Sequence, residues 1–312
     1  MKILITGATG FVGAYLTEHL VIEDHEVIAV IRTNSNKWRL SKIISNINCL
    51  EIDLCDSFNL NTIIKQLNPE IIFHFAAYGG YPFQKETLKI IHTNLIGTVN
   101  LVDACLNIDY KAFINIGSSS EYGTKINPMK ETDVLEPINA YGVAKASATL
   151  YCHMIAKTQN RSIATVRLFS PYGCYEDKSR LIPSVILSCL KGKNPELSSG
   201  AAVRDFIFIE DVIELLKTVS SSKNIGGKIY NGGSGKQHSV EEMVNAIIQQ
   251  VDTKIKPAWG CLEGRVSDAA QKWEADMSLV KRELNWQPKF TLETGVKKTV
   301  EWYKKNIELY GV

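Results

Sequence analysis

A glycine-rich turn near the start of the chain, TGATGFVG at 6–13, links an apolar run at 2–6 to a helical stretch at 11–22, and a second apolar run follows at 26–31. A strand, a helix and a strand within about 30 residues have the dimensions of a βαβ unit. The alternation continues, with strand-like runs at 48–53, 70–77, 112–119 and 163–170 between helical stretches at 58–67, 86–107 and 141–158. Apolar runs buried on both faces and joined by helices predict an α/β fold with a doubly wound parallel sheet.

The glycines of this turn favour binding of a dinucleotide. Gly7 can adopt a turn conformation barred to other residues, Gly10 lets the backbone approach a pyrophosphate, and Gly13 lets the helix pack closely on the strand. The start of the helix adds free N–H groups and the positive end of the helix dipole. The spacing G-x-x-G-x-x-G differs from the usual G-x-G-x-x-G, so the prediction depends on the context of strand, turn and helix.

The residues after the second strand bear on which dinucleotide is bound. An acid at this point would accept hydrogen bonds from the adenosine 2′-hydroxyl of NAD, but the run ends in Ile31 and Arg32. A guanidinium suits a 2′-phosphate through paired, charge-assisted hydrogen bonds. NADP(H) is therefore favoured over NAD(H), and a solvated loop cation is the alternative for Arg32. Asp53 closes the third strand and is a candidate for binding the adenine or for a simple cap.

A second, smaller lobe is predicted from about residue 171, where Pro and Gly interrupt the alternation of strands and helices. The interruptions are Pro171, Gly173, Pro183, Gly192, Pro195 and Gly200. A strand entering a helix recurs at 204–212, so we expect the chain to return to the first lobe. The expected division is a dinucleotide-binding domain of residues 1–170 plus about 204–235, and a smaller lobe of about 171–203 plus 236–312.

Composition and charge exclude several classes of function. Of the 312 residues, 45% are apolar, and 35 Lys plus Arg against 33 Asp plus Glu leave a formal charge of +2, so neither nucleic acid nor an anionic membrane is an expected partner. No apolar run approaches the roughly 18 residues of a membrane span. The seven cysteines include no C-x-x-C pair and are expected to be mostly buried free thiols. We expect a cytoplasmic protein without a metal site.

Two further stretches carry candidate catalytic groups. Tyr141 and Lys145 lie four residues apart on a predicted helix and hence on one face. A phenol titrates near pH ~10, and an adjacent ammonium lowers that pKa, so the pair can donate and accept a proton. Ser118, Ser119 and Ser120 follow a buried-type strand and are expected at the carboxyl ends of the parallel strands, where such folds bind ligands. With the glycine turn, these groups fit an enzyme that transfers hydride at a carbinol or carbonyl.

In order and spacing, the motifs resemble the extended short-chain dehydrogenase/reductase family that acts on nucleotide-activated sugars and has a Rossmann sheet. The resemblance covers nearly the whole chain. The matching segments are TGATGFVG (6–13), DL (53–54), HFAA (74–77), Asn94 with Gly97 and Thr98, SSSEYG (118–123), YGVAK (141–145), VRLFSPYG (166–173), RDFIFIEDV (204–212), YNGGSG (230–235) and LNWQPKFTLETGVKKTVEWY (284–303).

The resemblance implies a role for each matching catalytic residue. Tyr141 would be the acid/base, and Lys145 would bind the nicotinamide ribose and acidify Tyr141. Ser118 would hydrogen-bond the reacting oxygen, with Ser119 as a close competitor. Asn94 would help to hold a water network at the lysine. The residues implied to contact the cofactor are Gly7, Gly10, Phe11, Val12, Gly13, Arg32, Asp53, Leu54, Ala76, Asn94, Tyr141 and Lys145.

The resemblance also implies residues that bind a nucleotide-activated sugar. Arg204 would bind its phosphates, Arg265 is a weaker candidate for the same end, and a surface ion pair is the alternative for both. The loop that contains Tyr78 is expected to line the sugar site or to form a surface turn. Phe169 and Ser170 stand close to the point where family members often have Asn, so we expect the phosphates to be recognised differently here. The remaining candidates are Ser119, Ser120 and Arg180.

Three reactions can use the same catalytic groups and cofactor site, namely 4-epimerisation, 4,6-dehydration, and net reduction or oxidation. Dehydratases of the family carry an acidic pair directly after the catalytic hydroxyl, whereas this chain has Ser119 and Ser120. A hydroxyl is a poor general acid, so dehydration is disfavoured. Glu121 comes one place later, and its side chain would point away from that of Ser120 if the local chain alternates.

The identity of the cofactor decides between epimerisation and net reduction or oxidation. Epimerases mostly keep NAD bound with the help of an acid after the second strand, which Ile31 and Arg32 do not supply. The segments 76–84 and 179–183 are similar to reductases of 4-keto-6-deoxyhexose nucleotides. We therefore predict an NADP(H)-dependent reductase acting at C4 of an NDP-4-keto-6-deoxyhexose in deoxysugar biosynthesis, with NAD-dependent 4-epimerisation as the alternative.

Two further expectations concern catalysis and assembly. A dinucleotide sensor without turnover is a remaining alternative, but a sensor has no need of the intact Ser118, Tyr141 and Lys145. Family members commonly pair through two long helices. The resemblance therefore implies a homodimer through the helices near 86–107 and 141–158.

Overall fold

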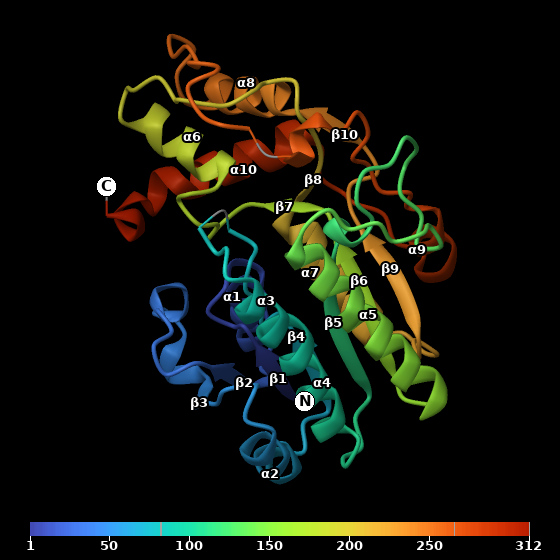
Figure 1. Ribbon diagram of the computed structural model, residues 1–312. Coiled ribbons are helices and arrows are strands. Elements are labelled where there is room, and N and C mark those ends of the chain that lie inside the picture. Colours follow the sequence, from blue (N-terminus) through green and yellow to red (C-terminus); the bar gives the residue numbers. More distant parts are fainter. Residues whose placement is uncertain (82, 265, 312) are drawn as a thin grey trace.

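The structure, a computed structural model that describes residues 1–81, 83–264 and 266–311, is built on a seven-stranded sheet (Figure 1). Its strands run in the order β3-β2-β1-β4-β5-β6-β9, and every neighbouring pair is parallel. The predicted doubly wound α/β fold is therefore confirmed. The strands are β1 (Lys2–Thr6), β2 (Glu26–Ile31), β3 (Asn48–Glu51), β4 (Ile71–His74), β5 (Ala112–Ser118), β6 (Ile163–Leu168) and β9 (Lys228–Gly232).

Helices cover both faces of this sheet. The helices α2, α4 and α5 pack beside one another on one face, and α1 and α7 pack on the other. The predicted helical stretch 86–107 is divided into α3 and α4 by a π-helical turn, His92–Ile96. The bounds are α1 (Phe11–Ile22), α2 (Ser57–Leu67), α3 (Thr87–Ile91), α4 (Gly97–Cys105), α5 (Ala140–Thr158) and α7 (Ile209–Ser221).

The apolar runs of the sequence become strands because both of their faces are buried. In β1, Ile3 and Ile5 pack with α1 and α7, whereas Leu4 packs with α2 and α4 on the opposite face. All six residues of β6 are buried, although Thr165 and Arg167 are polar. This two-sided burial explains why the runs are continuous rather than alternating. It also fixes the register that brings the strand ends to one edge.

A smaller sheet adjoins the carboxyl ends of the large one. It contains β7 (Ser170–Tyr172), β8 (Val203–Phe208) and β10 (Gln237–Ser239) in the order β10-β8-β7. The run 204–212 was expected to return to the first lobe as a strand entering a helix. Its strand part is β8, which pairs with β7 and β10, so the return to the large sheet begins only with α7. The other helices of this part are α6 (Leu181–Leu190), α8 (Val240–Val251), α9 (Ser278–Leu284) and α10 (Leu292–Lys305).

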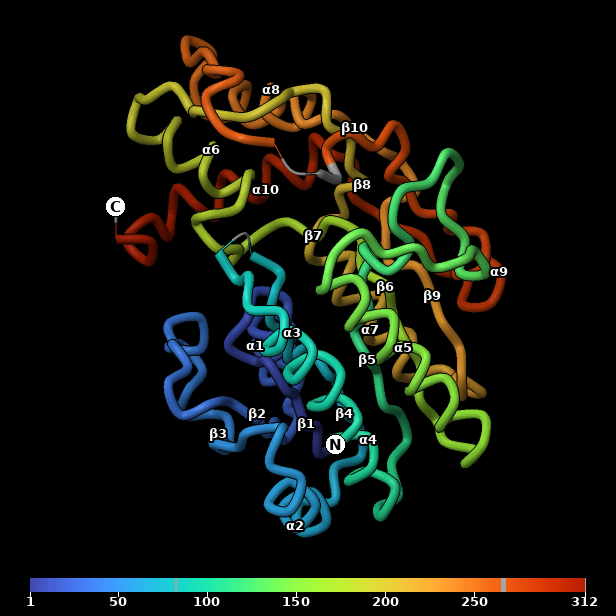
Figure 2. Tube along the Cα trace, viewed as in Figure 1, coloured from blue at the N-terminus to red at the C-terminus, as the bar shows by residue number. Residues whose placement is uncertain are grey.

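Segments far apart in the sequence meet above the end of β5. The loop that follows Gly123 lies alongside residues 270–277 in the tube drawing (Figure 2). Isolated β-bridges join Lys125 to Lys272 and Met129 to Ala275. This contact closes the edge of the sheet at which the predicted catalytic serines lie.

The structure also bears on the cysteines and on membrane insertion. All seven cysteines are free, and Cys105, Cys152, Cys174 and Cys189 are buried, as expected for most of them. Across residues 1–81, 83–264 and 266–311, no helix is both long and apolar enough to cross a bilayer.

Candidate active site

The glycine turn between β1 and α1 is closely packed against the end of β4. Gly7 has a φ of +71°, and a Cβ at this position would lie 2.6 Å from the backbone nitrogen of Ala76. A Cβ at Gly13 would lie 2.4 Å from the carbonyl oxygen of Gly7. Both positions therefore require glycine, one for its backbone conformation and both for close approach.

The start of α1 has the properties of an anion site. Gly10 is exposed and is the N-cap, and no side chain caps the free N–H groups. The first turn carries no acid, and its first residues, Phe11 and Val12, are half-buried. The guanidinium of Arg39 hydrogen-bonds the carbonyl oxygen of Thr9 at 3.2 Å and adds positive charge beside the turn. The residues present therefore fit the pyrophosphate of a dinucleotide.

The end of β2 carries no carboxylate. Ile31 is buried, and Arg32 follows with an exposed side chain. A tight turn holds Arg32, because its N–H donates to the Ser35 hydroxyl at 3.0 Å and the Ser35 N–H donates to its carbonyl at 2.9 Å. Asp53 is also exposed and accepts a 2.9 Å hydrogen bond from the Cys55 N–H, which is an Asx turn, and the N-cap of α2 is Asp56 instead. Leu54 is buried beside Gly97.

Asn94 holds the loop that follows β4. Its side-chain oxygen accepts the Tyr78 N–H at 2.9 Å, and its amide donates to the Tyr78 carbonyl at 2.6 Å. The Tyr78 ring packs against Ile90 and Ala144, and its hydroxyl donates to Glu86 at 2.7 Å. The side-chain oxygen and amide of Asn94 therefore both hydrogen-bond the Tyr78 backbone. The Tyr78 side chain packs between α3 and α5.

Ser118, Tyr141 and Lys145 come together at the carboxyl end of β5. The Asn139 side chain caps α5 by accepting the Gly142 N–H at 2.8 Å, which places Tyr141 in the first turn of the helix and Lys145 in the next. The Ser118 hydroxyl lies near the Tyr141 phenol and lowers its pKa. Lys145 is buried, with 3% of its surface exposed. The predicted catalytic groups are therefore neighbours.

Burial and nearby charges shift the pKa values of Tyr141 and Lys145. Burial raises the pKa of the Tyr141 phenol, and the Arg180 guanidinium lowers it. The Glu121 carboxylate raises the pKa of Tyr141 again, and the nearby Ser118 hydroxyl lowers it. Burial lowers the pKa of the Lys145 ammonium, while the charge of Glu121 works against that change. The environment therefore combines an apolar setting with charges of both signs.

The second and third serines have structural partners. The Ser119 oxygen accepts a 3.1 Å hydrogen bond from the Trp273 indole N–H, and Ser119 is buried. The Ser120 N–H donates to the Ser118 oxygen at 3.1 Å. A Cβ at Gly142 would lie 2.4 Å from the carbonyl oxygen of Ser120, so this glycine lets α5 approach the serine turn. Ser118 is therefore the serine whose hydroxyl faces Tyr141.

The two described arginines expected to bind substrate both have partners within the protein. Arg204, on β8, forms a 2.5 Å ion pair with Asp268 and lies over the Trp273 ring. Arg180 donates to the Gly80 carbonyl at 3.0 Å and lies over the ring of Tyr81. Arg265 lies outside the described residues.

Phe169 and Ser170 continue the chain from β6 into β7. Phe169 is buried, its N–H donates to the Gly232 carbonyl at 3.0 Å, and its ring packs near that of Tyr122. Ser170 is half-buried and pairs with Phe206 in the small sheet. Their roles in binding a substrate remain predictions.

Sequence reasoning missed two residues that shape this site. Trp273 reaches Ser119 across 154 positions of sequence, and no local pattern signals that contact. Asp205 is buried, and its carboxylate accepts N–H groups from Ser234, Gly235 and Ala275. Its place beside Arg204 in the RDF segment was the available signal. Burial raises the pKa of Asp205 to about 6, although these hydrogen bonds lower it.

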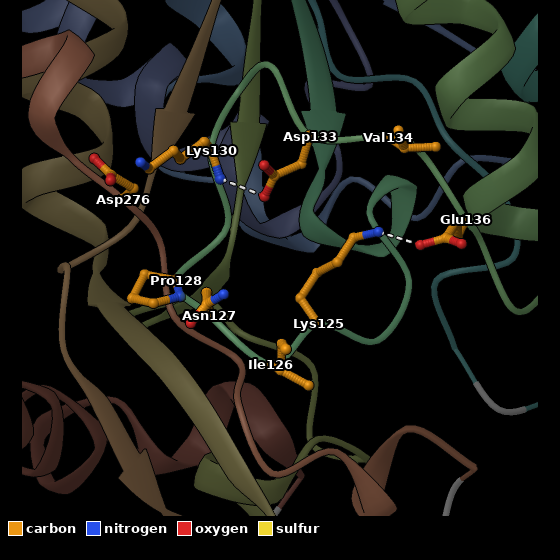
Figure 3. Close-up of a pocket in the computed structure, with 9 residues that line it drawn as sticks. All are labelled: Lys125, Ile126, Asn127, Pro128, Lys130, Asp133, Val134, Glu136 and Asp276. Carbon is orange, nitrogen blue, oxygen red and sulfur yellow. Dashed lines mark hydrogen bonds and ion pairs between the residues drawn. The ribbon is translucent and has the colours of Figure 1, made fainter.

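Two surface hollows lie outside this group of residues. One, of about 750 Å³, is lined by the loop 125–136 and Asp276 (Figure 3). Within it the Lys130 backbone N–H donates to the Asp133 carboxylate, and the Lys125 ammonium pairs with Glu136. The other, of about 1160 Å³, lies between the C-terminal end of α1 and the length of α7. Neither is lined by the serine, tyrosine and lysine described above.

Comparison with known proteins gives the same chemical context. Residues 3–233 match the NAD dependent epimerase/dehydratase family. The UDP-glucuronate 4-epimerase of Thermodesulfobacterium geofontis is 29% identical, over 98% of this chain and 97% of that protein.

Solved structures agree over the full length. The dTDP-glucose 4,6-dehydratase of Bacillus anthracis in complex with NAD has a TM-score of 0.86 and 26% identity, covering 100% of this chain and 99% of that one. The UDP-glucose 4-epimerase of Thermotoga maritima with UDP-glucose has a TM-score of 0.90 and 26% identity, covering 98% and 100%.

Proposed function

The chain belongs to the NAD dependent epimerase/dehydratase family, and from that membership we propose that it reduces C4 of a nucleotide-activated 4-keto-6-deoxyhexose with NADPH. The observation that carries the choice of cofactor and reaction is the end of β2. An apolar Ile31 and an exposed Arg32 stand where an NAD-retaining enzyme has an acid for the adenosine ribose. A cofactor consumed in each turnover suits a reductase.

The proton in this reaction comes from Tyr141. When bound, the nicotinamide supplies the hydride that reaches C4. Tyr141 gives its phenolic proton to O4, so that the C4 carbonyl becomes a secondary alcohol and the phenolate takes a proton back from solvent. Ser118 hydrogen-bonds O4, and Lys145 stabilises the phenolate with its positive charge. The contact between the Ser118 hydroxyl and the Tyr141 phenol supports these assignments.

Dehydration is disfavoured by the surroundings of the second and third serines. A 4,6-dehydratase needs a group that protonates O6 and a base that removes the proton at C5. Ser119 is buried and accepts the Trp273 indole N–H, and a hydroxyl is a weak acid and a weak base in any case. Glu121 is wholly buried, and its carboxylate is bonded to the Ser118 N–H and to Arg167.

A 4-epimerase is the second candidate function. The likeness to the UDP-glucuronate 4-epimerase and to the UDP-glucose 4-epimerase favours it. Epimerisation uses the same hydroxyl, phenol and ammonium, but the hydride taken from C4 returns to the opposite face of the sugar. In either reaction we assign the nucleotide phosphates to Arg204 from its place in the RDF segment. The structure shows the alternative expected for this residue, an ion pair with Asp268, so phosphates would have to displace that carboxylate.

We further propose that two copies of the chain pair through α3, α4 and α5 and work in the cytoplasm. These helices pack together, and their outer faces carry exposed apolar side chains. The residues are Leu88, Val143, Leu150 and Met154, and Ile96 of the π-helical turn between α3 and α4 is also exposed. Seven free thiols suit a reducing compartment.

The decisive experiment supplies NADPH together with a 4-keto-6-deoxyhexose linked to dTDP, UDP, GDP or CDP. Oxidation of NADPH with formation of the 6-deoxyhexose supports the reductase. Interconversion of UDP-glucose and UDP-galactose without net oxidation would replace it with the epimerase. A Tyr141→Phe variant should bind NADPH normally and lose turnover by about 100-fold or more. Undiminished turnover of that variant would refute the assigned proton donor.

A further inference from the structure

We infer that Glu121 is a positioning residue that holds the catalytic Ser118 in place, and that it does so as one half of a buried ion pair with Arg167. This inference rests on the proposed roles of Ser118 and Tyr141. Glu121 itself has no place for a substrate, because its side chain is completely buried and both of its oxygens have partners inside the protein.

The contacts of Glu121 fix the backbone at the catalytic serine. Its Oε1 accepts the Ser118 N–H at 2.8 Å, and the Ser118 oxygen in turn accepts the Ser120 N–H at 3.1 Å. This reciprocal arrangement is a capping box at the start of a single 3₁₀ turn, Ser119–Glu121. Because the Ser118 oxygen already accepts one hydrogen bond, its own hydrogen is left to be donated toward Tyr141.

Arg167 makes a charged Glu121 tolerable in this buried position. Its Nε donates to Glu121 Oε2 at 2.7 Å, and only 2% of the Arg167 side chain is exposed. The remaining guanidinium group donates to the Tyr122 hydroxyl at 3.0 Å and to the Glu131 carbonyl at 3.3 Å. The Tyr122 hydroxyl then donates to Asn231 at 2.6 Å. An ion pair this deeply buried is stable only when its other hydrogen bonds are satisfied as well.

The strand register explains how both charges fit beneath the site. Gly117 on β5 pairs directly with Arg167 on β6. A Cβ at Gly117 would lie 2.6 Å from Glu121 Oε1 and 3.0 Å from Arg167 Cγ. The carboxylate therefore occupies the space that any other residue at 117 would fill. Glycine at this position is what allows the pair to lie under the catalytic serine.

The charge of Glu121 also affects the pKa values of Tyr141 and Lys145. It raises the pKa of Lys145 against the effect of burial, and it raises the pKa of Tyr141. The other groups that act on Tyr141 are Arg180, Ser118 and Tyr81, and Cys152 acts on Lys145. Glu121 thus favours a protonated phenol and a protonated amine, which is the state that a reductase needs before it gives a proton to O4.

The test compares Glu121→Gln with Glu131→Gln in the enzyme saturated with NADP⁺. Glu131 is a matched control, because its carboxylate accepts the Asn231 N–H in the same polar network but does not touch Ser118. Ionisation of Tyr141 is followed by tyrosinate absorbance during a pH titration, with Tyr141→Phe as the blank. Steady-state rates are measured with NADPH and dTDP-4-keto-6-deoxyglucose.

We expect Glu121→Gln to move the Tyr141 titration to lower pH by about half a unit or more, because it removes a nearby negative charge. It should lower kcat by about 10- to 100-fold through the displaced serine, with little change in KM for the sugar. Glu131→Gln should do neither. If Glu121→Gln does not fold, the double variant Glu121→Gln with Arg167→Met removes both charges. It should still lower the pH at which Tyr141 ionises.

The results separate this inference from the proposed function. An unmoved Tyr141 titration, or an equal shift in Glu131→Gln, overturns the inference. An unchanged kcat in Glu121→Gln also overturns it, because the serine would then not depend on the carboxylate. If the wild-type enzyme oxidises no NADPH with the sugar, the proposed reductase fails, while the titration, which needs no turnover, still decides whether Glu121 acts on Tyr141.

Discussion

The indole N–H of Trp273 donates a 3.1 Å hydrogen bond to the hydroxyl oxygen of Ser119 in the buried interior. The Arg204 guanidinium lies over the same indole, 5.2 Å from the ring centre. One aromatic side chain therefore touches both the serine turn and the arginine assigned to the nucleotide phosphates. The two ends of the proposed substrate site are joined through Trp273.

Replacing Trp273 with Phe should weaken both ends at once. The Ser119 hydroxyl loses its donor, and Arg204 loses the stronger face of an indole. We expect the free energy of unfolding to fall by about 2 kcal/mol and KM for the nucleotide sugar to rise several-fold. Urea unfolding and steady-state kinetics measure the two effects.

Trp286→Phe is the matched control for this substitution. Trp286 is equally buried, but its indole nitrogen has no hydrogen-bond partner among the residues that the structure describes. The change therefore removes a large ring without breaking a hydrogen bond, and KM should stay at the wild-type value. A rise in KM for both variants would show that ring volume, rather than the contact with Ser119, is responsible.

Glu176 should make the stability of the protein depend on pH. Its side chain is buried, one carboxyl oxygen has no hydrogen-bond partner within 1–81, 83–264 and 266–311, and burial raises its pKa to about 8 from an ordinary value of 4.5. Between these values the folded protein binds a proton that the unfolded chain has lost. The free energy of unfolding therefore falls as the pH rises from about 4.5 to about 8.

Glu176→Gln should remove this loss of stability. The amide carries no charge, so the variant should gain on the order of 3 kcal/mol relative to wild type at pH ~9 and much less at pH ~5. Thermal unfolding at the two pH values measures the difference. The exposed Glu301→Gln is the control, and its difference from wild type should be the same at both. A constant difference for Glu176→Gln would contradict the prediction.

The large sheet and the glycine turn could be predicted because their signals are local. The runs at β1, β5 and β6 are apolar on both faces, and the turn at Gly7 follows a strand and opens a helix. The pairing of Tyr141 with Lys145 on one helix face follows from a spacing of four residues. These features depend on neighbours in the sequence.

The remainder depends on packing between distant segments. The strand β8 was predicted, but its membership of the small sheet is decided by pairing with β7 and β10. The contact of Trp273 with Ser119 follows from the way that the chain after β9 folds back over the serine turn. The role of Glu121 could not be predicted, because its partner Arg167 lies on the neighbouring strand and the pairing depends on the register of β5 and β6.

Arg32 should distinguish the two nicotinamide cofactors. If its exposed guanidinium binds a 2′-phosphate, Arg32→Ala should weaken NADPH binding by about 10- to 100-fold, as expected for a charge-assisted hydrogen bond. NADH binding should change little, since NADH has no such phosphate. Titration of nicotinamide fluorescence with each cofactor measures both dissociation constants.

Lys37→Ala is the control for Arg32. Lys37 is a nearby surface cation that pairs with Glu51 at 3.5 Å. Removing it lowers the net positive charge by the same amount, so a general electrostatic effect on NADPH would appear in both variants. A loss of NADH affinity in Arg32→Ala equal to the loss of NADPH affinity would show that Arg32 stabilises the turn rather than binding phosphate.

Leu150 on α5 should decide the state of assembly. Its side chain is 57% exposed, and Val143 and Met154 lie on the same helix with large exposed fractions. If α5 packs against a second copy, Leu150→Arg buries a charge in an apolar contact and should convert the dimer to a monomer, measured by light scattering. Phe58 on α2 is 80% exposed, so Phe58→Arg is the control and should leave the dimer intact. A dimer that survives only the change at Leu150 would place the interface at α2.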